Sequence, residues 1–194
     1  MRDPLETAWE IHQFLSARQV PYAIIGGLAV QHWGRPRLTT DLDVTVAVRA
    51  ERTQAFLQDV ITQFTPRVKD PEAFARSTRV ILVRASNDCP IDISLAIPGY
   101  EDSVMSRVVE YEVRSGQRLR FCSPEDLIIH KAVAGRPLDV QNIEGVVFRQ
   151  GDALDAEYIR RWLRDFAATL ESPEVLERFE APWRQLRRGG HRIP

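Results

Sequence analysis

The segment 40–48, TDLDVTVAV, constrains the fold of this chain most, because its side chains alternate between two chemical classes. A β-strand sends successive side chains to opposite faces, so this pattern predicts a strand with one apolar face and one carboxylate-bearing face. Two carboxylates at positions i and i+2 of a strand have Cα atoms about 6.5 to 7 Å apart and converge on a shared divalent cation. The apolar face holds Leu42, Val44, Val46 and Val48, and the other face holds Asp41, Asp43, Thr45 and Ala47.

A third carboxylate, Asp92, stands in the same arrangement further along the chain. Residues 79–84 (RVILVR) predict a strand, and residues 90–97 (PIDISLAI) predict its hairpin partner. Hard oxygen ligands on a rigid sheet suit Mg²⁺, and two such ions activate the attacking oxygen and stabilise the leaving oxygen in phosphoryl displacement. In the second strand Ile91, Ile93, Leu95 and Ile97 share the face opposite to Asp92 and Ser94.

A glycine pair lies upstream of these acids. The apolar run 22–25 ends at Gly26 and Gly27, and a helix-forming stretch follows at 28–33. Glycines at a strand-to-helix junction let backbone N–H groups approach a phosphate at the positive end of the helix. Taken alone, the pair is more often a tight turn that needs positive φ. Together with Asp41 and Asp43, it predicts a phosphate cradle and a metal site within one strand–helix–strand unit.

The remaining periodicities predict an α+β fold, with a mixed β-sheet flanked by helices. A catalytic α+β core is expected over residues 1–122, and a helical part packed on it over residues 123–194. Within the second part, Ser123 and Pro124 open a helix that ends near Gly135. Helices are expected at 5–19, 51–64, 138–148, 156–170 and 173–186, and two further short strands at 107–114 and 118–121.

The composition excludes several classes of protein. The 194 residues carry 26 Lys and Arg against 27 Asp and Glu, so no global field attracts nucleic acid or membrane. No apolar stretch is long enough for a membrane span, and a cytoplasmic location is expected. Cys89 and Cys122 stand in no metal-binding spacing, so both thiols are expected to be free and buried.

The ordered motifs resemble a known family. The segment GGLAVQHWGRPRLTTDLDV is similar to the signature of the nucleotidyltransferase fold of the DNA polymerase β superfamily, in which Gly-Gly or Gly-Ser precedes Asp-x-Asp and a third strand Asp. More narrowly, it resembles AbiEii/AbiGii-type nucleotidyltransferases, toxins of type IV toxin–antitoxin systems. The segment SPEDLIIHKAVAGRPLDVQNI resembles the downstream block of that group. Together the motifs span about residues 22–143.

The resemblance implies roles for particular residues. Asp92 is implied as metal ligand or as general base, and Lys131 as a catalytic contact to the phosphates. Two departures from the family pattern are Leu28, where the superfamily commonly has Ser, and Asn142, where a second acid is expected. The implied ligands of two Mg²⁺ ions are Asp41, Asp43 and Asp92, and the implied nucleotide-binding residues are Gly26, Gly27, Arg37, Lys131 and Asp139.

The leading hypothesis is a Mg²⁺-dependent nucleotidyltransferase that moves an NMP from an NTP to an acceptor hydroxyl and releases pyrophosphate. The resemblance implies a tRNA acceptor and a cognate antitoxin as protein partner. One alternative is transfer to a small molecule such as an aminoglycoside, and another is a non-catalytic nucleotide-binding protein. An acidic acceptor pocket would draw on Glu144, Asp152 and Asp155. A cluster able to contact RNA, or equally a solvated tail, consists of Arg184, Arg187, Arg188, His191 and Arg192.

Overall fold

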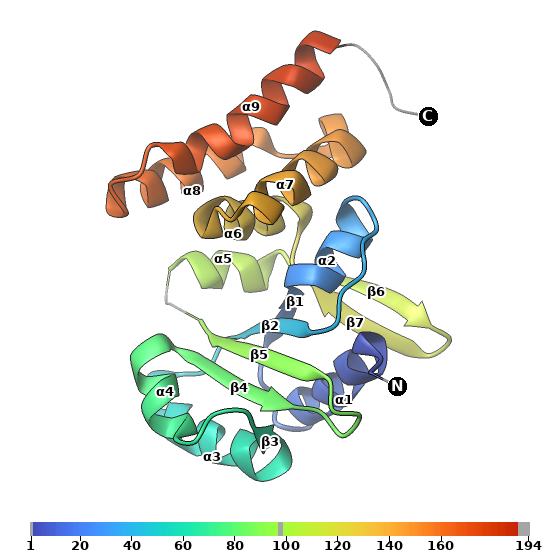
Figure 1. The fold of residues 1–194 in the computed structure, drawn as a ribbon, viewed down its shortest axis with the longest axis vertical. Coiled ribbons are helices and arrows are strands. Elements are labelled where there is room, and N and C mark those ends of the chain that lie inside the picture. The colour runs from blue at the N-terminus through green and yellow to red at the C-terminus, as the bar shows by residue number, and fades with distance from the viewer. Residues whose placement is uncertain (1, 97–98, 190–194) are drawn as a thin grey trace. The chain divides into compact units, whose positions relative to one another are not determined.

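The computed structural model describes residues 2–96 and 99–189, and its chain divides into two compact units (Figure 1). The first unit comprises residues 1–28 and 38–122, and the second comprises residues 29–37 and 123–194. The division expected from the sequence, 1–122 and 123–194, stays a prediction about the folding units. Ile97, expected at the end of a strand, lies outside the described residues.

A seven-stranded mixed sheet forms the centre of the first unit, in the order β3-β4-β5-β2-β1-β7-β6. Neighbours β2 and β5 are parallel, as are β1 and β7, and the other pairs are antiparallel. The predicted α+β class with a mixed sheet is therefore confirmed. The strands are β1 (Tyr22–Ile25), β2 (Leu42–Val46), β3 (Thr65–Pro66), β4 (Val80–Arg84), β5 (Pro90–Leu95), β6 (Val109–Arg114) and β7 (Gln117–Phe121).

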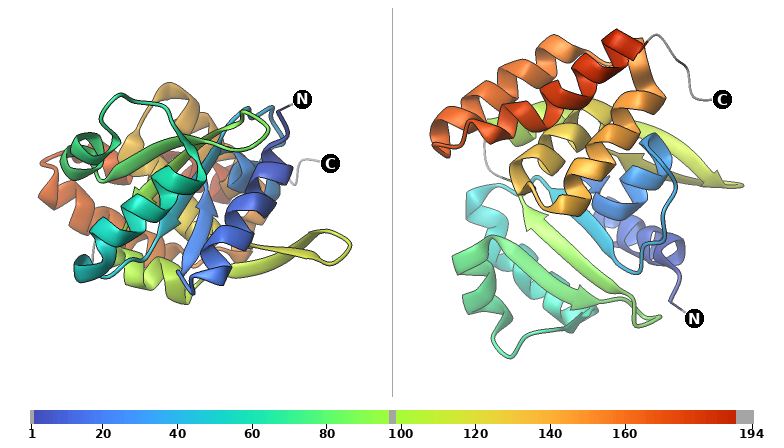
Figure 2. Two further views of the ribbon diagram at one scale, coloured as in Figure 1. Left: turned by 90° about the horizontal axis from the view of Figure 1, so that it is seen from below. Right: turned by 45° about the horizontal axis from the view of Figure 1, so that its top comes forward.

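Two helices of the first unit, α1 (Pro4–Ala17) and α3 (Thr53–Gln63), lie side by side (Figure 2). The ring of Phe14 lies 6.4 Å from that of Phe56 and 5.1 Å from that of Phe64, centroid to centroid. The apolar strand residues expected in the core, such as Val44 and Ile93, are fully buried. Burial of this surface supplies most of the free energy that holds the sheet and helices together.

Two helices of the first unit were not expected from the sequence. No element is expected from the sequence between residues 64 and 79, but Pro71 occupies the first turn of α4 (Pro71–Thr78), where its fixed φ favours a helix. The side chain of Asp70 caps this helix by accepting from the backbone N–H of Ala73 at 2.8 Å. The second unexpected helix is α5 (Tyr100–Ser106).

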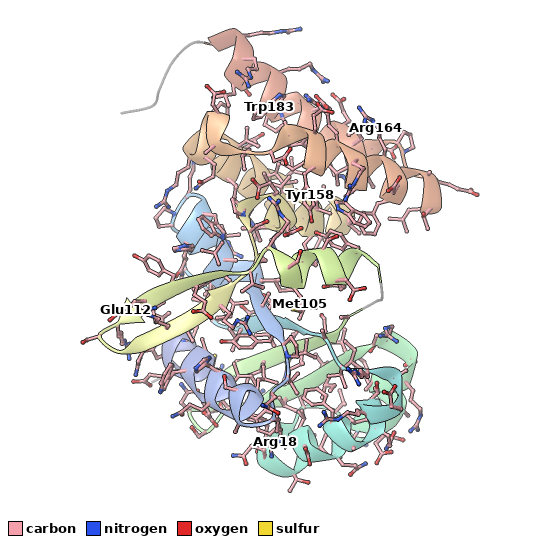
Figure 3. The ribbon with its side chains drawn as sticks, turned by 180° about the vertical axis from the view of Figure 1, so that it is seen from behind. Arg18, Met105, Glu112, Tyr158, Arg164 and Trp183 are labelled. Carbon is pink, nitrogen blue, oxygen red and sulfur yellow. The ribbon has the colours of Figure 1, made fainter. Side chains whose placement is uncertain are left out.

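The strand bounds differ slightly from those expected. Asp41 lies one residue before β2, so only Asp43 of the pair is within the strand. The expected hairpin between 79–84 and 90–97 is confirmed as the antiparallel pair β4–β5. A further hairpin, β6–β7, turns at Gly116, whose φ of +74° suits glycine, and Figure 3 labels Glu112 on its first strand. The helix expected over 51–64 begins as a 3₁₀ turn, η1 (Ala50–Arg52), and continues as α3.

The second unit is helical. Its helix α6 begins where expected, because Ser123 accepts from the N–H of Asp126 at 3.1 Å, and it ends at Gly135 with a φ of +64°. Phe179 and Trp183 stack 5.6 Å apart within α9, and Trp183 is labelled in Figure 3. The helices of this unit are the C-terminal part of α2 (Gly26–Trp33), α6 (Pro124–Ala134), α7 (Pro137–Gln150), η2 (Gly151–Ala153), α8 (Ala156–Thr169) and α9 (Glu174–Gly189).

Two expectations about the chain as a whole can be compared with the structure. Cys89 and Cys122 are buried free thiols, as expected. Within the described residues, none of the helices combines the length and the hydropathy that a membrane span requires.

Candidate active site

Asp43 and Asp92 are direct neighbours in the sheet of the first unit. Strands β2 and β5 are parallel, and the Cα atoms of these two residues are partners in the register. Neighbouring strands lie about 4.8 Å apart, so the two side chains stand next to each other on one face. Both residues are partly exposed, whereas Val44 and Ile93, on the opposite face, are buried. The structure therefore brings together two of the three aspartates from distant parts of the sequence.

A threonine that the sequence interpretation missed holds the third aspartate. The hydroxyl of Thr39 donates to Oδ1 of Asp41 at 2.9 Å. Thr39 is 7% exposed, while Asp41 is exposed. A buried hydroxyl thus fixes one oxygen of Asp41 at the start of β2. The local signal was present, since a Ser or Thr two residues before an Asp is able to form such a hydrogen bond.

The two glycines make room for these side chains. Gly26 has a φ of +63°, and a Cβ atom there would overlap the carboxylate of Asp43. A Cβ atom on Gly27 would overlap the hydroxyl of Thr39. The predicted order of strand, glycine turn and helix is confirmed by β1 and α2. Steric room for Asp43 and Thr39 is therefore sufficient to explain why both positions are glycine. The phosphate-binding role of the two glycines stays a prediction.

Arg67 is a second residue that the sequence interpretation missed. Its guanidinium Nη1 donates to Oδ1 of Asp92 in an ion pair, with side chains 25% and 37% exposed. The backbone N–H of Arg67 donates to the carbonyl of Leu82 at 3.0 Å, and Leu82 is the register partner of Asp92. The backbone hydrogen bond to Leu82 therefore places Arg67 next to Asp92. No sequence signal could have revealed it, because the pairing of two distant strand segments creates it.

A further acid lies on the same face of the sheet. Thr45, two residues after Asp43 on β2, donates its hydroxyl to Oε2 of Glu101 at 3.1 Å. Glu101 belongs to α5, a helix that was not expected, so the sequence interpretation missed this carboxylate as well. The polar face of β2 and β5 thus carries more negative charge than the three aspartates alone.

Lys131 and Asp139 form a buried ion pair within the second unit. Nζ of Lys131 lies 2.9 Å from Oδ1 of Asp139, and Nε of Arg136 lies 2.6 Å from Oδ2. Burial raises the pKa of Asp139, but hydrogen bonds from Arg136 and Lys131 outweigh burial and lower the pKa below its ordinary value. The two residues named by the resemblance therefore contact each other, and their nucleotide-binding roles stay predictions.

The remaining candidates of the second unit lie on or beside its helices. Arg37 is half-buried, and its backbone carbonyl accepts from the side chain of Gln31 at 2.6 Å. Asn142 is 6% exposed, and its Nδ2 finds no hydrogen-bond partner in the part of the chain that the structure describes. Asp152 forms an ion pair with Arg187 at 2.8 Å. His191 and Arg192 lie outside the described residues.

The carboxylates of the first unit can be tested for their fit to Mg²⁺. Asp41, Asp43 and Asp92 offer hard oxygen donors, the ligand type that Mg²⁺ prefers. Among residues 2–96 and 99–189, however, no group of three His, Cys, Asp or Glu is arranged as a metal cluster. Asp92 is held by Arg67, so it can join Asp41 and Asp43 as a ligand only when this partly exposed ion pair opens.

Comparison with solved structures identifies the fold. An antigenic nucleotidyltransferase-like protein from Paracoccidioides brasiliensis aligns with a TM-score of 0.51 and 16% identity, over 91% of each chain. ANT(2″)-Ia, solved in complex with adenylyl-2″-tobramycin, aligns with a TM-score of 0.50 and 23% identity, over 85% of this chain and 99% of its own. No family model and no curated protein matches the sequence. The chain has a nucleotidyltransferase-like fold, in agreement with the superfamily resemblance.

Proposed function

We propose that this protein is a Mg²⁺-dependent nucleotidyltransferase that transfers an NMP from an NTP to an acceptor hydroxyl. The acceptor oxygen forms a bond to the α-phosphorus, the bond from that phosphorus to the β-phosphate bridge breaks, and pyrophosphate leaves. The hydroxyl proton passes to a carboxylate of the site. Bound Mg²⁺ would neutralise triphosphate charge and favour attack at the α-phosphorus.

The juxtaposition of Asp43 and Asp92 carries this proposal. Two carboxylates that are register partners on parallel strands repel each other unless a cation lies beside them. Arg67 supplies positive charge to Asp92, and a bound cation would supply it to the carboxylates of Asp41 and Asp43. Two further residues position these carboxylates. Thr39 donates a hydrogen bond to Asp41, and Gly26 lacks the Cβ atom that would overlap Asp43.

Two observations bear on the acceptor. The structure of ANT(2″)-Ia contains an adenylylated aminoglycoside, which favours a small polar molecule with hydroxyl groups. The narrower sequence resemblance to AbiEii/AbiGii-type toxins favours the end of a tRNA, with an antitoxin as partner. We propose the small-molecule acceptor first, because the structural likeness extends over most of both chains.

The proposal is tested by finding which molecule receives the labelled nucleotide. Purified protein is incubated with each α-labelled NTP and Mg²⁺, once with total RNA and once with a panel of aminoglycosides. A matched variant, Asp165→Asn, removes an exposed carboxylate of α8 and serves as the control for Asp41→Asn and Asp43→Asn.

Each outcome has a distinct meaning. Label on an aminoglycoside that disappears in both aspartate variants and persists in the control supports the proposal. Label in a tRNA-sized band supports nucleotidyl transfer and identifies RNA, in place of a small molecule, as the acceptor. NTP binding without any pyrophosphate release would contradict the proposed enzymatic activity and would favour a non-catalytic nucleotide-binding protein.

A further inference from the structure

A second site lies in the first unit, in an open pocket of about 480 Å³. Its wall includes Pro21, which precedes β1, and Ala47 and Val48, which follow β2. Asp43 pairs with Ile25 at the other end of the same two-stranded ladder. Ala47 lies four positions after Asp43, which corresponds to about 13 Å at 3.3 Å per step along an extended chain. The pocket is therefore separate from the aspartates.

Positive charge dominates the rim of this pocket. Arg18, Arg49 and Arg52 line it, against the single carboxylate of Asp59. Arg18 is neutralised, because its Nε lies 3.2 Å from Oδ2 of Asp59. Arg49 and Arg52 are exposed, and neither side chain forms an ion pair or hydrogen bond with any other residue that the structure describes. Two guanidinium groups are thus available to an anion.

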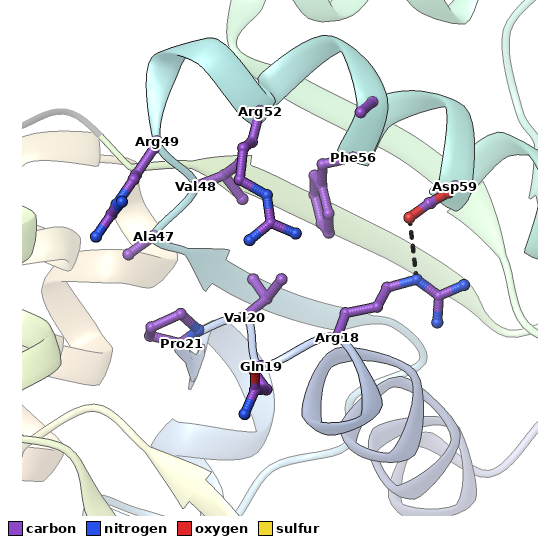
Figure 4. Close-up of a pocket in the computed structure, with 11 residues that line it drawn as sticks. Arg18, Gln19, Val20, Pro21, Ala47, Val48, Arg49, Arg52, Phe56 and Asp59 are labelled. Carbon is purple, nitrogen blue, oxygen red and sulfur yellow. Dashed lines mark hydrogen bonds and ion pairs between the residues drawn. The ribbon is translucent and has the colours of Figure 1, made fainter.

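The start of a helix adds to this charge. Arg49 is the N-cap of η1 and Arg52 is the N-cap of α3, and neither side chain caps the N–H groups that follow. The first N–H groups of a helix carry partial positive charge and favour an anion. Figure 4 shows Arg52 extending toward Val20 and Arg49 extending past Ala47.

The back of the pocket is apolar. Phe56 is 5% exposed and lies beside Val20 and Val48 in the lining (Figure 4). Pockets of roughly 300 to 1,000 Å³ with apolar walls and a few converging polar groups are typical of small-molecule sites. As a ligand for two guanidinium groups, a phosphate with two negative charges is a better match than a carboxylate with one.

We infer that this pocket binds a small phosphorylated molecule with an apolar ring. The phosphate contacts Arg49 and Arg52 at the helix start, and the ring packs against Phe56 and Val48. The site goes beyond the proposed transfer reaction, and its occupation does not depend on Mg²⁺ or on the three aspartates.

The test uses 1-naphthyl phosphate as the probe, with the full chain in the presence of EDTA. Alanine methyl groups are labelled for NMR, because Ala47 and Ala55 line the pocket, whereas Ala132 is buried in the second unit. Saturable shifts of the two pocket methyl signals, with Ala132 unchanged, are the expected result. Inorganic phosphate, which lacks the ring, is expected to bind at least about tenfold more weakly.

Variants then assign the binding to the arginines. The double variant Arg49→Gln/Arg52→Gln is expected to weaken binding by about tenfold or more, because charge-assisted hydrogen bonds are lost. Arg118→Gln removes an exposed arginine of β7 that does not line the pocket, and it is expected to change affinity less than about twofold. Asp43→Asn is expected to bind the probe as the wild type does.

Three results would overturn the inference. These are the absence of saturable shifts at Ala47 and Ala55, equal affinity of the double variant and the wild type, and equal affinity for inorganic phosphate and the probe. Loss of binding in Asp43→Asn would place the probe at the aspartates and would also overturn it. Thermal melting of each variant shows whether the fold is retained, and exposed Arg49 and Arg52 are not expected to affect it.

Discussion

Nζ of Lys131 lies 2.9 Å from Oδ1 of Asp139, and the two side chains are only 9% and 2% exposed. A buried charge that loses its partner is strongly destabilising, typically by about 3 to 5 kcal/mol, whereas removing both charges together is often nearly neutral. This ion pair therefore links α6 to α7.

Lys131→Met is expected to lower the free energy of unfolding by about 1.5 to 3 kcal/mol, because Asp139 loses one charged partner and keeps its ion pair with Arg136. The double variant Lys131→Met/Asp139→Leu is expected to recover most of that loss, because no buried charge is left alone. Urea unfolding measures both. Arg184→Met breaks the exposed pair with Glu177 and serves as the control, with a loss of less than about 1 kcal/mol. Equal stability of Lys131→Met and the wild type would contradict a structural role for the pair.

Gly26→Ala is expected to reduce activity by about 100-fold, because its methyl group would displace the carboxylate of Asp43. The positive φ adds a loss of stability of about 1 to 2 kcal/mol. Gly116→Ala is the matched control, since this glycine has a φ of +74° and no atom within 4 Å of the added methyl group. It is expected to lose similar stability and to keep full activity. Kinetics and thermal melting separate the two effects, and an active Gly26→Ala would refute the steric argument.

Arg67→Gln is expected to increase the apparent affinity for Mg²⁺, because the arginine competes with the ion for Asp92. The pair is partly exposed and worth about 1 kcal/mol, which corresponds to roughly a fivefold change. The Mg²⁺ concentration that gives half-maximal pyrophosphate release measures it. Arg76→Gln, which breaks the exposed pair with Glu72, is expected to leave this concentration unchanged. A higher Mg²⁺ requirement in Arg67→Gln would show that the arginine supports the ion instead.

The stability of the protein is expected to fall as the pH drops below about 6.5. Burial, with the nearby charge of Lys131, lowers the pKa of His130 from 6.5 to about 4. Between these two values the unfolded chain binds a proton that the folded chain does not, so acid favours unfolding by at most about 3 kcal/mol. His130→Leu is expected to show a smaller decrease between pH 7 and pH 4.5 in urea unfolding. Parallel curves for the variant and the wild type would exclude His130 as the source.

The elements that carry the site were largely predictable from the sequence. Alternation in 40–48 and 90–97 identified both strands and the aspartates on their polar faces, because a period of two residues is visible without knowledge of the partner strand. The capping residues Ser123 and Gly135 likewise identified the bounds of α6. The helices α4 and α5 were missed because both are short, and because Pro71 at the start of α4 and Gly99 just before α5 are residues that usually interrupt structure.

The surroundings of the acids were less predictable. Arg67 reaches Asp92, and Glu101 reaches Thr45, only because distant segments meet on one face of the sheet. Such contacts depend on the order of strands, which no local pattern contains. The steric reason for Gly26 likewise depends on Asp43, although the need for glycine after a strand was visible.

We propose that Asp43 and Asp92 form a Mg²⁺-dependent catalytic centre. The rate of pyrophosphate release with NTP, Mg²⁺ and the acceptor that takes the label tests it most directly. We expect Asp43→Asn and Asp92→Asn each to lower this rate by about 100-fold or more, while Asp165→Asn stays within about twofold of the wild type. Pyrophosphate release at the wild-type rate in both aspartate variants would show that these carboxylates are not the catalytic centre.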